Sequence, residues 1–101
     1  MTELQFRLTV GTPDQLPVVT AVGDIDRTNA DDFKDALAQA ANGASAIIVD
    51  MTAVPYCDSS AVQALFTVAR ATEVHLVVPT TGPIRTLLRI SGLDQIVTVS
   101  T

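Results

Sequence analysis

The sequence predicts an α/β fold in which helices pack on a mixed β-sheet. Short segments that alternate apolar and polar residues are typical of strands, whereas other segments repeat apolar residues at helical spacing. Their order along the chain is β-β-α-β-α-β-α-β, and strands that alternate with helices form parallel sheets. With 101 residues, of which 48% are hydrophobic, the chain is predicted to be a single domain spanning residues 1–101.

The first two predicted strands form a hairpin, which makes the sheet mixed. Residues 4–10 alternate apolar and polar side chains, as in a strand with one buried face. The turn signal Gly-Thr-Pro-Asp follows at residues 11–14. The returning strand is predicted over residues 17–22, because Pro17 is tolerated at a strand start and Gly23 ends the pattern.

The first helix is predicted to begin near Thr28 or Asn29, since both residue types are favoured N-caps. Apolar residues that recur at helical spacing predict its buried face: Ala30, Phe33, Leu37, Ala40 and Ala44. Asn42 and Gly43 provide a left-handed stop. Residues 46–49 are apolar at every position, which predicts a central parallel strand that is covered on both faces.

A second helix and another strand follow. Pro55 separates the central strand from this helix, which is predicted to begin around Ser59 or Ser60. The apolar stripe of the helix comprises Val62, Leu65, Phe66 and Ala69. Residues 74–78 are predicted as the next strand, because Pro79 stops the apolar run.

The last predicted elements are a third helix and a short strand. Pro83 suits the first turn of a helix, and Gly92 suits its left-handed end. The inner face of this helix is predicted to carry Ile84, Leu87, Leu88 and Ser91. Residues 96–99 are predicted as a final short strand or an extended tail.

The charge of the chain excludes one class of partner and favours another. The net charge is −5, and the six basic residues are scattered, so no basic face for nucleic acid is predicted. A basic protein partner is the natural expectation. Five aspartates lie within twelve residues of each other: Asp24, Asp26, Asp31, Asp32 and Asp35. This acidic cluster is interpreted either as a solvated helix face or as a docking patch.

Groups for catalysis and metal binding are sparse, which predicts a non-enzymatic protein with no catalytic residues, metal or cofactor. The one histidine, His75, is expected to face solvent from a strand or to cap the core. The one cysteine, Cys57, cannot form an internal disulfide, and no signal-peptide pattern is present, so a cytoplasmic location without membrane insertion is expected. A position just before a helix favours the Cys57 thiolate, and a redox role stays open.

The functional prediction depends on Asp58-Ser59-Ser60, where a loop after the central strand opens a helix. Each residue can cap a helix, and Ser60 with Gln63 fits a capping box. Because only one residue occupies the N-cap, capping by Ser60 leaves Ser59 outside the first turn and available to a partner. A phosphate on Ser59 brings about −1.5 to −2 charges to a helix end that stabilises anions. Phosphorylation is therefore predicted to preserve the fold and to change a binding surface.

Three stretches in register resemble the STAS domain of anti-sigma factor antagonists, and together they cover nearly the whole chain. Residues 50–54 (Asp-Met-Thr-Ala-Val), followed by Asp-Ser-Ser at 58–60, are similar to the family signature. Residues 23–26 (Gly-Asp-Ile-Asp) are similar to its Gly-Glu-Leu-Asp turn. Residues 83–88 and 91–94 resemble its third helix and exit. The resemblance implies a STAS-type mixed β-sheet.

The resemblance also implies a partner switch that regulates transcription. In such proteins the unphosphorylated form binds an anti-sigma factor that is also a serine kinase, and binding frees the sigma factor. The kinase phosphorylates the first serine of the motif, which corresponds to Ser59, and a phosphatase of the PP2C type resets the switch. The residues that the resemblance places in partner binding are Asp24, Asp58, Ser59, Ser60 and Ala61.

Two features depart from the family pattern. Ala61 stands where the family has glycine, so a partner that presses on the backbone is expected to meet a methyl group. The stretch 61–73 is shorter than the family's second helix and the glycine-containing loop after it. An alternative interpretation keeps the fold without the switch: a STAS subunit of a larger assembly, such as an ABC-type lipid transport complex or a stress-sensing complex.

Overall fold

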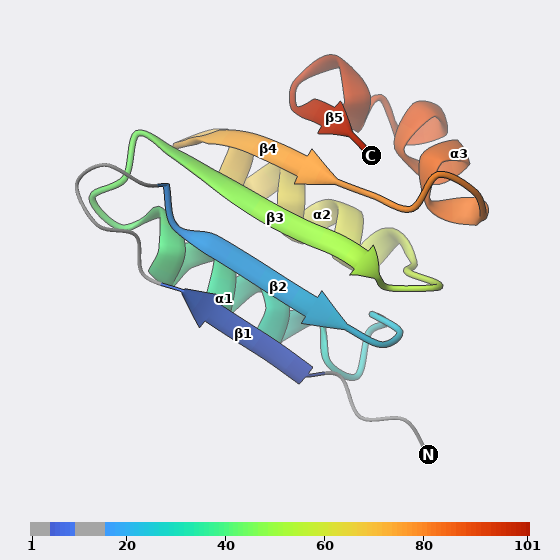
Figure 1. Ribbon diagram of the computed structural model, residues 1–101, viewed down its shortest axis with the longest axis horizontal. Helices are drawn as coiled ribbons and strands as arrows, with labels where there is room; N and C mark the ends of the chain where they lie inside the picture. The colour runs from blue at the N-terminus through green and yellow to red at the C-terminus, as the bar shows by residue number, and fades with distance from the viewer. Residues whose placement is uncertain (1–4, 10–15) are drawn as a thin grey trace.

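The computed structural model describes residues 5–9 and 16–101, which form a sheet of five strands with helices packed on it (Figure 1). The elements are β1 (Gln5–Thr9), β2 (Val18–Val22), α1 (Ala30–Ala41), β3 (Ala46–Ala53), α2 (Ser59–Ala69), β4 (Glu73–Val77), α3 (Pro83–Ser91), the 3₁₀ helix η1 (Leu93–Gln95) and β5 (Thr98–Ser100). This confirms the predicted α/β class and element order, to which η1 is an addition.

The strands lie in the sheet in their sequence order, β1-β2-β3-β4-β5. β1 pairs with β2 in antiparallel fashion, whereas β2, β3, β4 and β5 run parallel to one another. The predicted initial pair and the central position of β3 are therefore confirmed. The turn predicted at residues 11–14 lies outside the described residues.

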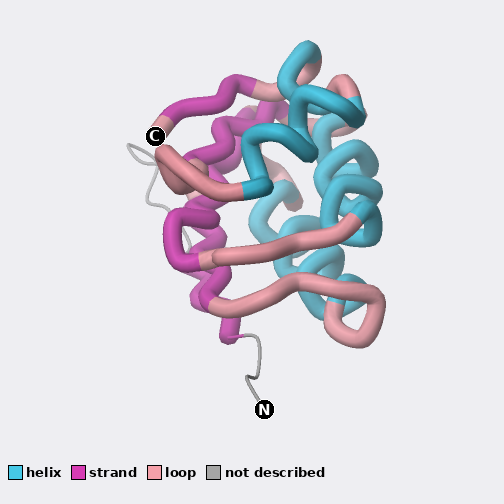
Figure 2. The backbone as a smooth tube through the Cα atoms, turned by 90° about the vertical axis from the view of Figure 1, so that its right-hand side faces the viewer, coloured by secondary structure: helices cyan, strands magenta, loops and turns pink. Residues whose placement is uncertain are grey.

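The three α-helices of the described chain cover one face of the sheet, and Figure 2 shows the strands in one layer and the helices in another. Burial along β3 agrees with this arrangement. Ile47, Val49 and Met51 have no exposed surface, whereas Ile48 and Asp50 between them are half-buried. The core therefore lies between the helices and the inner face of the sheet.

The prediction that the central strand is covered on both faces is wrong. Ile48 lies on the face without helices, in register with Val18 of β2 and His75 of β4. The cause is the strand order, because right-handed crossovers between strands that advance in one direction place every helix on the same side. The apolar run of β3 thus reflects a central position with strands on both sides, not two covered faces.

The buried stripe predicted for α1 is confirmed. Its four helical members are all buried: Ala30, Phe33, Leu37 and Ala40. Ala44 follows the end of the helix and packs, half-buried, against the same core. Burying side chains such as Phe33 and Leu37 contributes about 1.5–3 kcal/mol each, so this stripe accounts for a large part of the attachment of α1 to the sheet.

α2 buries a wider surface than the predicted stripe. Its buried residues are Ala61, Val62, Ala64, Leu65 and Val68. Phe66 and Ala69, which were predicted for the stripe, are only partly buried against the core. The reason is that α2 contacts α1 as well as the sheet, so side chains outside a single stripe are covered too.

The ends of the helices lie close to the predicted signals. Gly43 follows α1 with a φ of +76°, and Gly92 ends α3 with a φ of +80°, both in the left-handed region that favours glycine. Pro83 is the first residue of α3, and Ile84 and Leu88 are buried as predicted. None of the helices formed by residues 5–9 and 16–101 combines the length and apolar character that a membrane crossing requires.

The last strand differs from its prediction over residues 96–99. After α3 the chain forms η1, so β5 starts only at Thr98 and Ile96 stays outside the strand with 52% of its surface exposed. Val97, just before β5, is buried, with 8% of its surface exposed. The extra helical turn, made of backbone hydrogen bonds that follow Gly92, has no periodicity of its own in the sequence.

Candidate functional site

Two loops that follow neighbouring parallel strands lie side by side at one edge of the sheet. The Gly23 N–H donates to the Ala53 carbonyl at 3.1 Å, and the Ile25 N–H donates to the Tyr56 carbonyl at 3.1 Å. The Asp58 N–H then donates to the Ile25 carbonyl, also at 3.1 Å. These bonds continue the pairing of β2 and β3 beyond both strands, so the turn around Asp24 and the Asp-Ser-Ser motif share one edge.

The turn around Asp24 is fixed by the side chain of Asn29. The Asn29 Nδ2 donates to the Asp24 carbonyl at 3.0 Å, and the Asn29 Oδ1 accepts from the Asp26 N–H at 2.9 Å. Asn29 is the N-cap residue of α1 by position, but its side chain makes no bond to the helix. The Asp24 side chain is exposed and accepts no hydrogen bond from the part of the chain that the structure describes. Its backbone is thus held while its carboxylate faces solvent.

Asp26 plays a different part in the same turn. Its Oδ1 accepts hydrogen bonds from the Thr28 hydroxyl and from the Thr28 N–H, the latter at 2.8 Å. The hydroxyl bond first, and the backbone bond second, lower the pKa of Asp26. This charge is therefore used to close the turn, whereas the charge of Asp24 is available to a partner.

Asp58 is the N-cap of α2. Its Oδ1 accepts a hydrogen bond from the Ser60 N–H at 2.8 Å, and its extended backbone (φ −108°, ψ −170°) is typical of that position. The predicted capping box of Ser60 with Gln63 is therefore wrong, because Ser60 is the second residue inside the helix. A carboxylate at the N-cap also interacts favourably with the helix dipole, which a serine hydroxyl does not.

Ser59 is the first residue of α2 and is exposed. The expectation that it lies outside the first turn is wrong, since the helix begins two residues earlier than capping by Ser60 requires. Its hydroxyl nevertheless forms no hydrogen bond with the described residues, so it faces solvent at the positive end of the helix. Ser60, the next residue, is half-buried.

Ala61 lies beneath this surface. Its side chain has no exposed area and belongs to the hydrophobic core together with Ile25 and Leu65. The expectation that a partner meets this methyl group is therefore wrong. The methyl group that distinguishes this chain from the family pattern fills the core and supports the start of α2.

Neither Cys57 nor His75 forms a catalytic arrangement. Cys57 is 5% exposed, and burial, followed by the nearby charge of Asp58, raises the pKa of its thiol to about 11. The expectation that the thiolate is favoured is wrong, because burial outweighs the helix end. His75 lies half-buried on the open face of the sheet, as expected, with its Nε2 3.5 Å from Oε2 of Glu73. Among residues 5–9 and 16–101, no group of three or more potential ligands could hold a metal ion.

The acidic cluster spreads over the turn and the exposed side of α1. Asp31 and Asp32 lie in the first turn of the helix, and Asp35 is exposed further along it. Their position at a helix N-terminus accounts for them by dipole and solvation alone. The cluster therefore contributes Asp24 to the candidate site, and the solvated-face interpretation suffices for its helical members.

Tyr56 is a candidate contact residue that sequence reasoning missed. It stands in the loop between β3 and α2, two residues before Asp58, and 49% of its surface is exposed. Exposed aromatic side chains are enriched among residues that dominate binding energy at protein interfaces. The signal was present in the sequence, as an aromatic residue between a strand end and a capping motif, but its exposure was decided by the fold.

A family model described as the Mlab STAS domain matches residues 8–98 of the chain. No curated protein sequence matches it significantly. An anti-sigma factor antagonist from Mycobacterium paratuberculosis has a similar structure, with a TM-score of 0.82 and 22% identity over 97% of this chain and 86% of that one. The anti-sigma factor antagonist SpoIIAA in its unphosphorylated form is also similar, with a TM-score of 0.76 and 21% identity over 96% of this chain and 89% of that one.

Phosphorylated SpoIIAA, a cell fate determinant from Bacillus, is also similar, with a TM-score of 0.68 and 23% identity over 96% of this chain and 92% of that one. Identities at this level establish a shared fold. The family model spans most of the chain, from within β1 to the start of β5. This protein belongs to the STAS domain family.

Proposed function

We propose that this protein is an anti-sigma factor antagonist that works as a phosphorylatable binding switch in the cytoplasm. Its unphosphorylated form binds an anti-sigma factor with serine kinase activity and so releases the sigma factor. Phosphorylation of Ser59 ends the binding, and a PP2C-type serine phosphatase restores it. The observation that carries the proposal is the exposed Ser59 hydroxyl at the start of α2, beside two loops held together by backbone hydrogen bonds.

The position of Ser59 explains how a phosphate acts on binding without unfolding the domain. At the first residue of a helix, a phosphate lies at the positive end of the helix dipole, which stabilises an anion. The cap bond, in which the Ser60 N–H donates to Asp58 Oδ1, joins the residues on either side of Ser59 and does not use the Ser59 hydroxyl. The charge added on Ser59 thus changes the surface that a partner meets.

The proposed binding surface consists of Asp24, Tyr56, Asp58, Ser59 and Ser60, with Ala61 in the core beneath it. Two carboxylates already flank the serine along this edge, so a partner that fits the unphosphorylated form must supply donors or positive charge. A phosphate makes the surface more negative and larger at its centre. Like charges and unpaired groups at the centre of an interface cost several kcal/mol, which is enough to separate a transient complex.

The proposal is tested with the purified chain, candidate anti-sigma serine kinases and ATP, followed by intact-protein mass spectrometry. We expect the addition of a single phosphate that Ser59→Ala abolishes. Ser60→Ala is the matched control and should still receive a single phosphate. A phosphate that persists in Ser59→Ala but disappears in Ser60→Ala would show that Ser60, and not Ser59, is the phosphorylated residue.

A second candidate function is a STAS subunit that does not switch, within a larger assembly such as an ABC-type lipid transport complex. It is favoured by one observation, namely that the description of the matching family model names Mlab together with the STAS domain. Stoichiometric purification with a transporter ATPase, together with no effect of Ser59→Glu on that association, would favour this candidate over the switch.

A further inference from the structure

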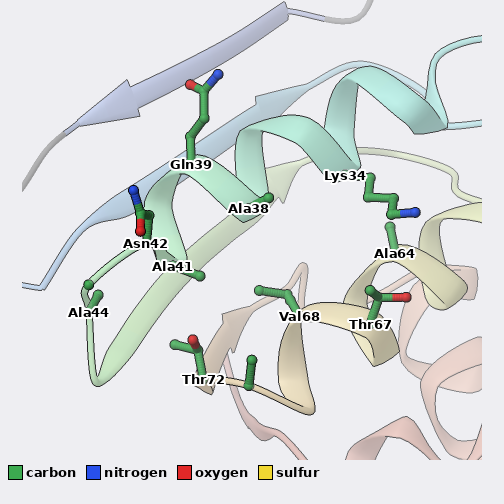
Figure 3. A pocket seen from close by; sticks show the side chains of 12 residues that line it. Lys34, Ala38, Gln39, Ala41, Asn42, Ala44, Ala64, Thr67, Val68 and Thr72 are labelled. Carbon is green, nitrogen blue, oxygen red and sulfur yellow. The ribbon is translucent and has the colours of Figure 1, made fainter.

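A groove runs between α1 and α2 on the side away from the sheet. It encloses about 690 Å³, and Figure 3 shows the side chains of both helices along it. Small residues form much of its lining: Ala38, Ala41, Ala44, Ala64 and Ala71. Because these side chains are short, the two helices leave a trough between them that a longer apolar side chain would fill.

The groove continues toward the candidate site. A second hollow of about 230 Å³ shares Lys34, Ala64 and Thr67 with the groove. Ser60 lines this second hollow and directly follows Ser59 in α2. The groove and the second hollow together form the trough, which leads from the C-terminal ends of α1 and α2 to the edge that carries the proposed switch.

The charge of this end of the trough is opposite to that of the chain. The chain has a net charge of −5, yet the lining of the two hollows includes Arg27 and Lys34 against a single acid, Asp31. Within the described part of the chain, neither cation forms an ion pair. Figure 3 shows the amino group of Lys34 extending over the trough toward α2, near Ala64. The end near Ser60 thus presents unpaired positive charge next to an apolar trough.

We propose that this trough is the docking site for an amphipathic helix of the protein partner, with apolar side chains along one face and acidic residues at the end that reaches Lys34 and Arg27. The inference rests on the proposed function, because it names where the anti-sigma factor engages the chain. An apolar trough between two helices is the geometry that helix-in-groove recognition uses. The unpaired cations fix the polarity of the bound helix, since its negative C-terminal end complements them.

This arrangement gives the switch a direct electrostatic route. A phosphate on Ser59 stands one residue from Ser60, which lines the cationic end of the trough. It would compete with the acidic residues of the partner for Lys34 and Arg27, and would repel those residues at the same time. Phosphorylation would then weaken docking along the trough as well as contact at the two loops.

The first test titrates the isotope-labelled full chain with synthetic helical peptides and follows backbone amide shifts by NMR. One peptide carries a Leu/Ala face and two C-terminal glutamates, and a matched peptide carries two C-terminal lysines instead. We expect the acidic peptide to bind about tenfold more tightly, which corresponds to about 1.4 kcal/mol, with shifts along α1 and α2. Equal binding of both peptides, or shifts confined to the open sheet face, would overturn the proposal.

The second test uses variants with matched controls on α3. Ala38→Gln, which adds bulk to an exposed position in the trough, should weaken the acidic peptide about tenfold, whereas Thr86→Gln should not. Lys34→Glu should reverse the preference in favour of the lysine peptide, and Arg85→Glu, with the same charge change, should leave it as in the wild type. Self-association that Ala38→Gln abolishes would instead assign the trough to a second copy of the chain.

The last test separates this inference from the proposed function. With a kinase that phosphorylates Ser59, Ala38→Gln and Lys34→Glu should raise the KM for the chain about tenfold while kcat changes little. Phosphorylation of both variants with unchanged KM would overturn docking in the trough and leave the switch intact. Failure of every candidate kinase on the wild type, with the peptide preference intact, would overturn the switch and support the trough.

Discussion

Replacing Asp58 tests whether the start of α2, and with it Ser59, is held by one side chain. Its Oδ1 accepts the Ser60 N–H at 2.8 Å, the single side-chain cap recorded for this helix. Losing an N-cap of this type costs about 0.5–2 kcal/mol, and losing its charge at the dipole costs about 0.3–1 kcal/mol. We therefore expect Asp58→Ala to destabilise the domain by about 1–2 kcal/mol.

Asp58→Asn separates the two contributions. Asparagine keeps an oxygen acceptor for the Ser60 N–H and removes only the charge, so it should cost less than about 1 kcal/mol. Ser60→Ala, which removes a hydroxyl that does not cap the helix, should change stability by less than about 0.5 kcal/mol. The order of stability is thus wild type and Ser60→Ala, then Asp58→Asn, then Asp58→Ala.

Thermal unfolding followed by circular dichroism measures these differences. For a domain of about 100 residues, 1 kcal/mol shifts the Tm by about 4–8 °C, so Asp58→Ala should lower it by roughly 4–16 °C. If Ser60→Ala lowers the Tm more than Asp58→Ala does, then Asp58 is not the residue that caps α2. Equal losses in Asp58→Asn and Asp58→Ala would show that the charge, and not the hydrogen bond, holds the helix end.

Five further outcomes are expected. Asp26, whose pKa is lowered chiefly by the Thr28 hydroxyl, stabilises the fold above its ordinary pKa of 3.8, and this contribution is lost as the pH falls through the lowered folded-state pKa. NMR titration should show that Thr28→Val raises the pKa of Asp26 toward the ordinary value, while the remaining backbone hydrogen bonds keep it lowered in part. Cys57, with a pKa raised from 9.0 to about 11, stabilises the folded state below pH 9.0, and this contribution is lost as the pH rises through about 11. Urea unfolding across this range should therefore show a free energy of unfolding that declines with pH, and Cys57→Ala should make this decline smaller. The same thiol should react with a thiol reagent much more slowly in the folded chain than in urea. Phe33→Ala, in the core under α1, should cost about 3–5 kcal/mol in urea unfolding. Ser59→Glu should keep the wild-type Tm within a few degrees and lose binding to the anti-sigma factor in a pull-down.

The local periodicity of the sequence was sufficient for the order of the strands and α-helices and for the buried face of α1. The α1 stripe and the left-handed glycines after α1 and α3 follow from residues that are near one another in the chain. Each of these features is decided by an interaction within one element or one turn. For that reason the fold class and the exposure of Ser59 could be predicted without coordinates.

The sequence pointed to Asp24 and the Asp-Ser-Ser motif as the candidate site, but not to Tyr56 or to the way in which the site is held together. Three adjacent residues could each have capped α2, and the sequence offers no measure of which one does. The fold decides in favour of Asp58, because its N–H is held by the Ile25 carbonyl and its backbone is thereby aligned with the helix start. That bond joins residues more than thirty positions apart, so it is invisible to any pattern along the chain.

What the sequence by itself determined is the order of the strands and α-helices, the buried stripe of α1 and the exposure of Ser59. Only the tertiary structure decided that the helices cover one face of the sheet, that Ala61 and Cys57 are buried, and that a trough with unpaired cations lies beside Ser60. The physical reason is the range of the interactions. Periodicity records the burial of a single element, whereas strand order, pairing between loops and the space between two helices depend on where distant segments meet.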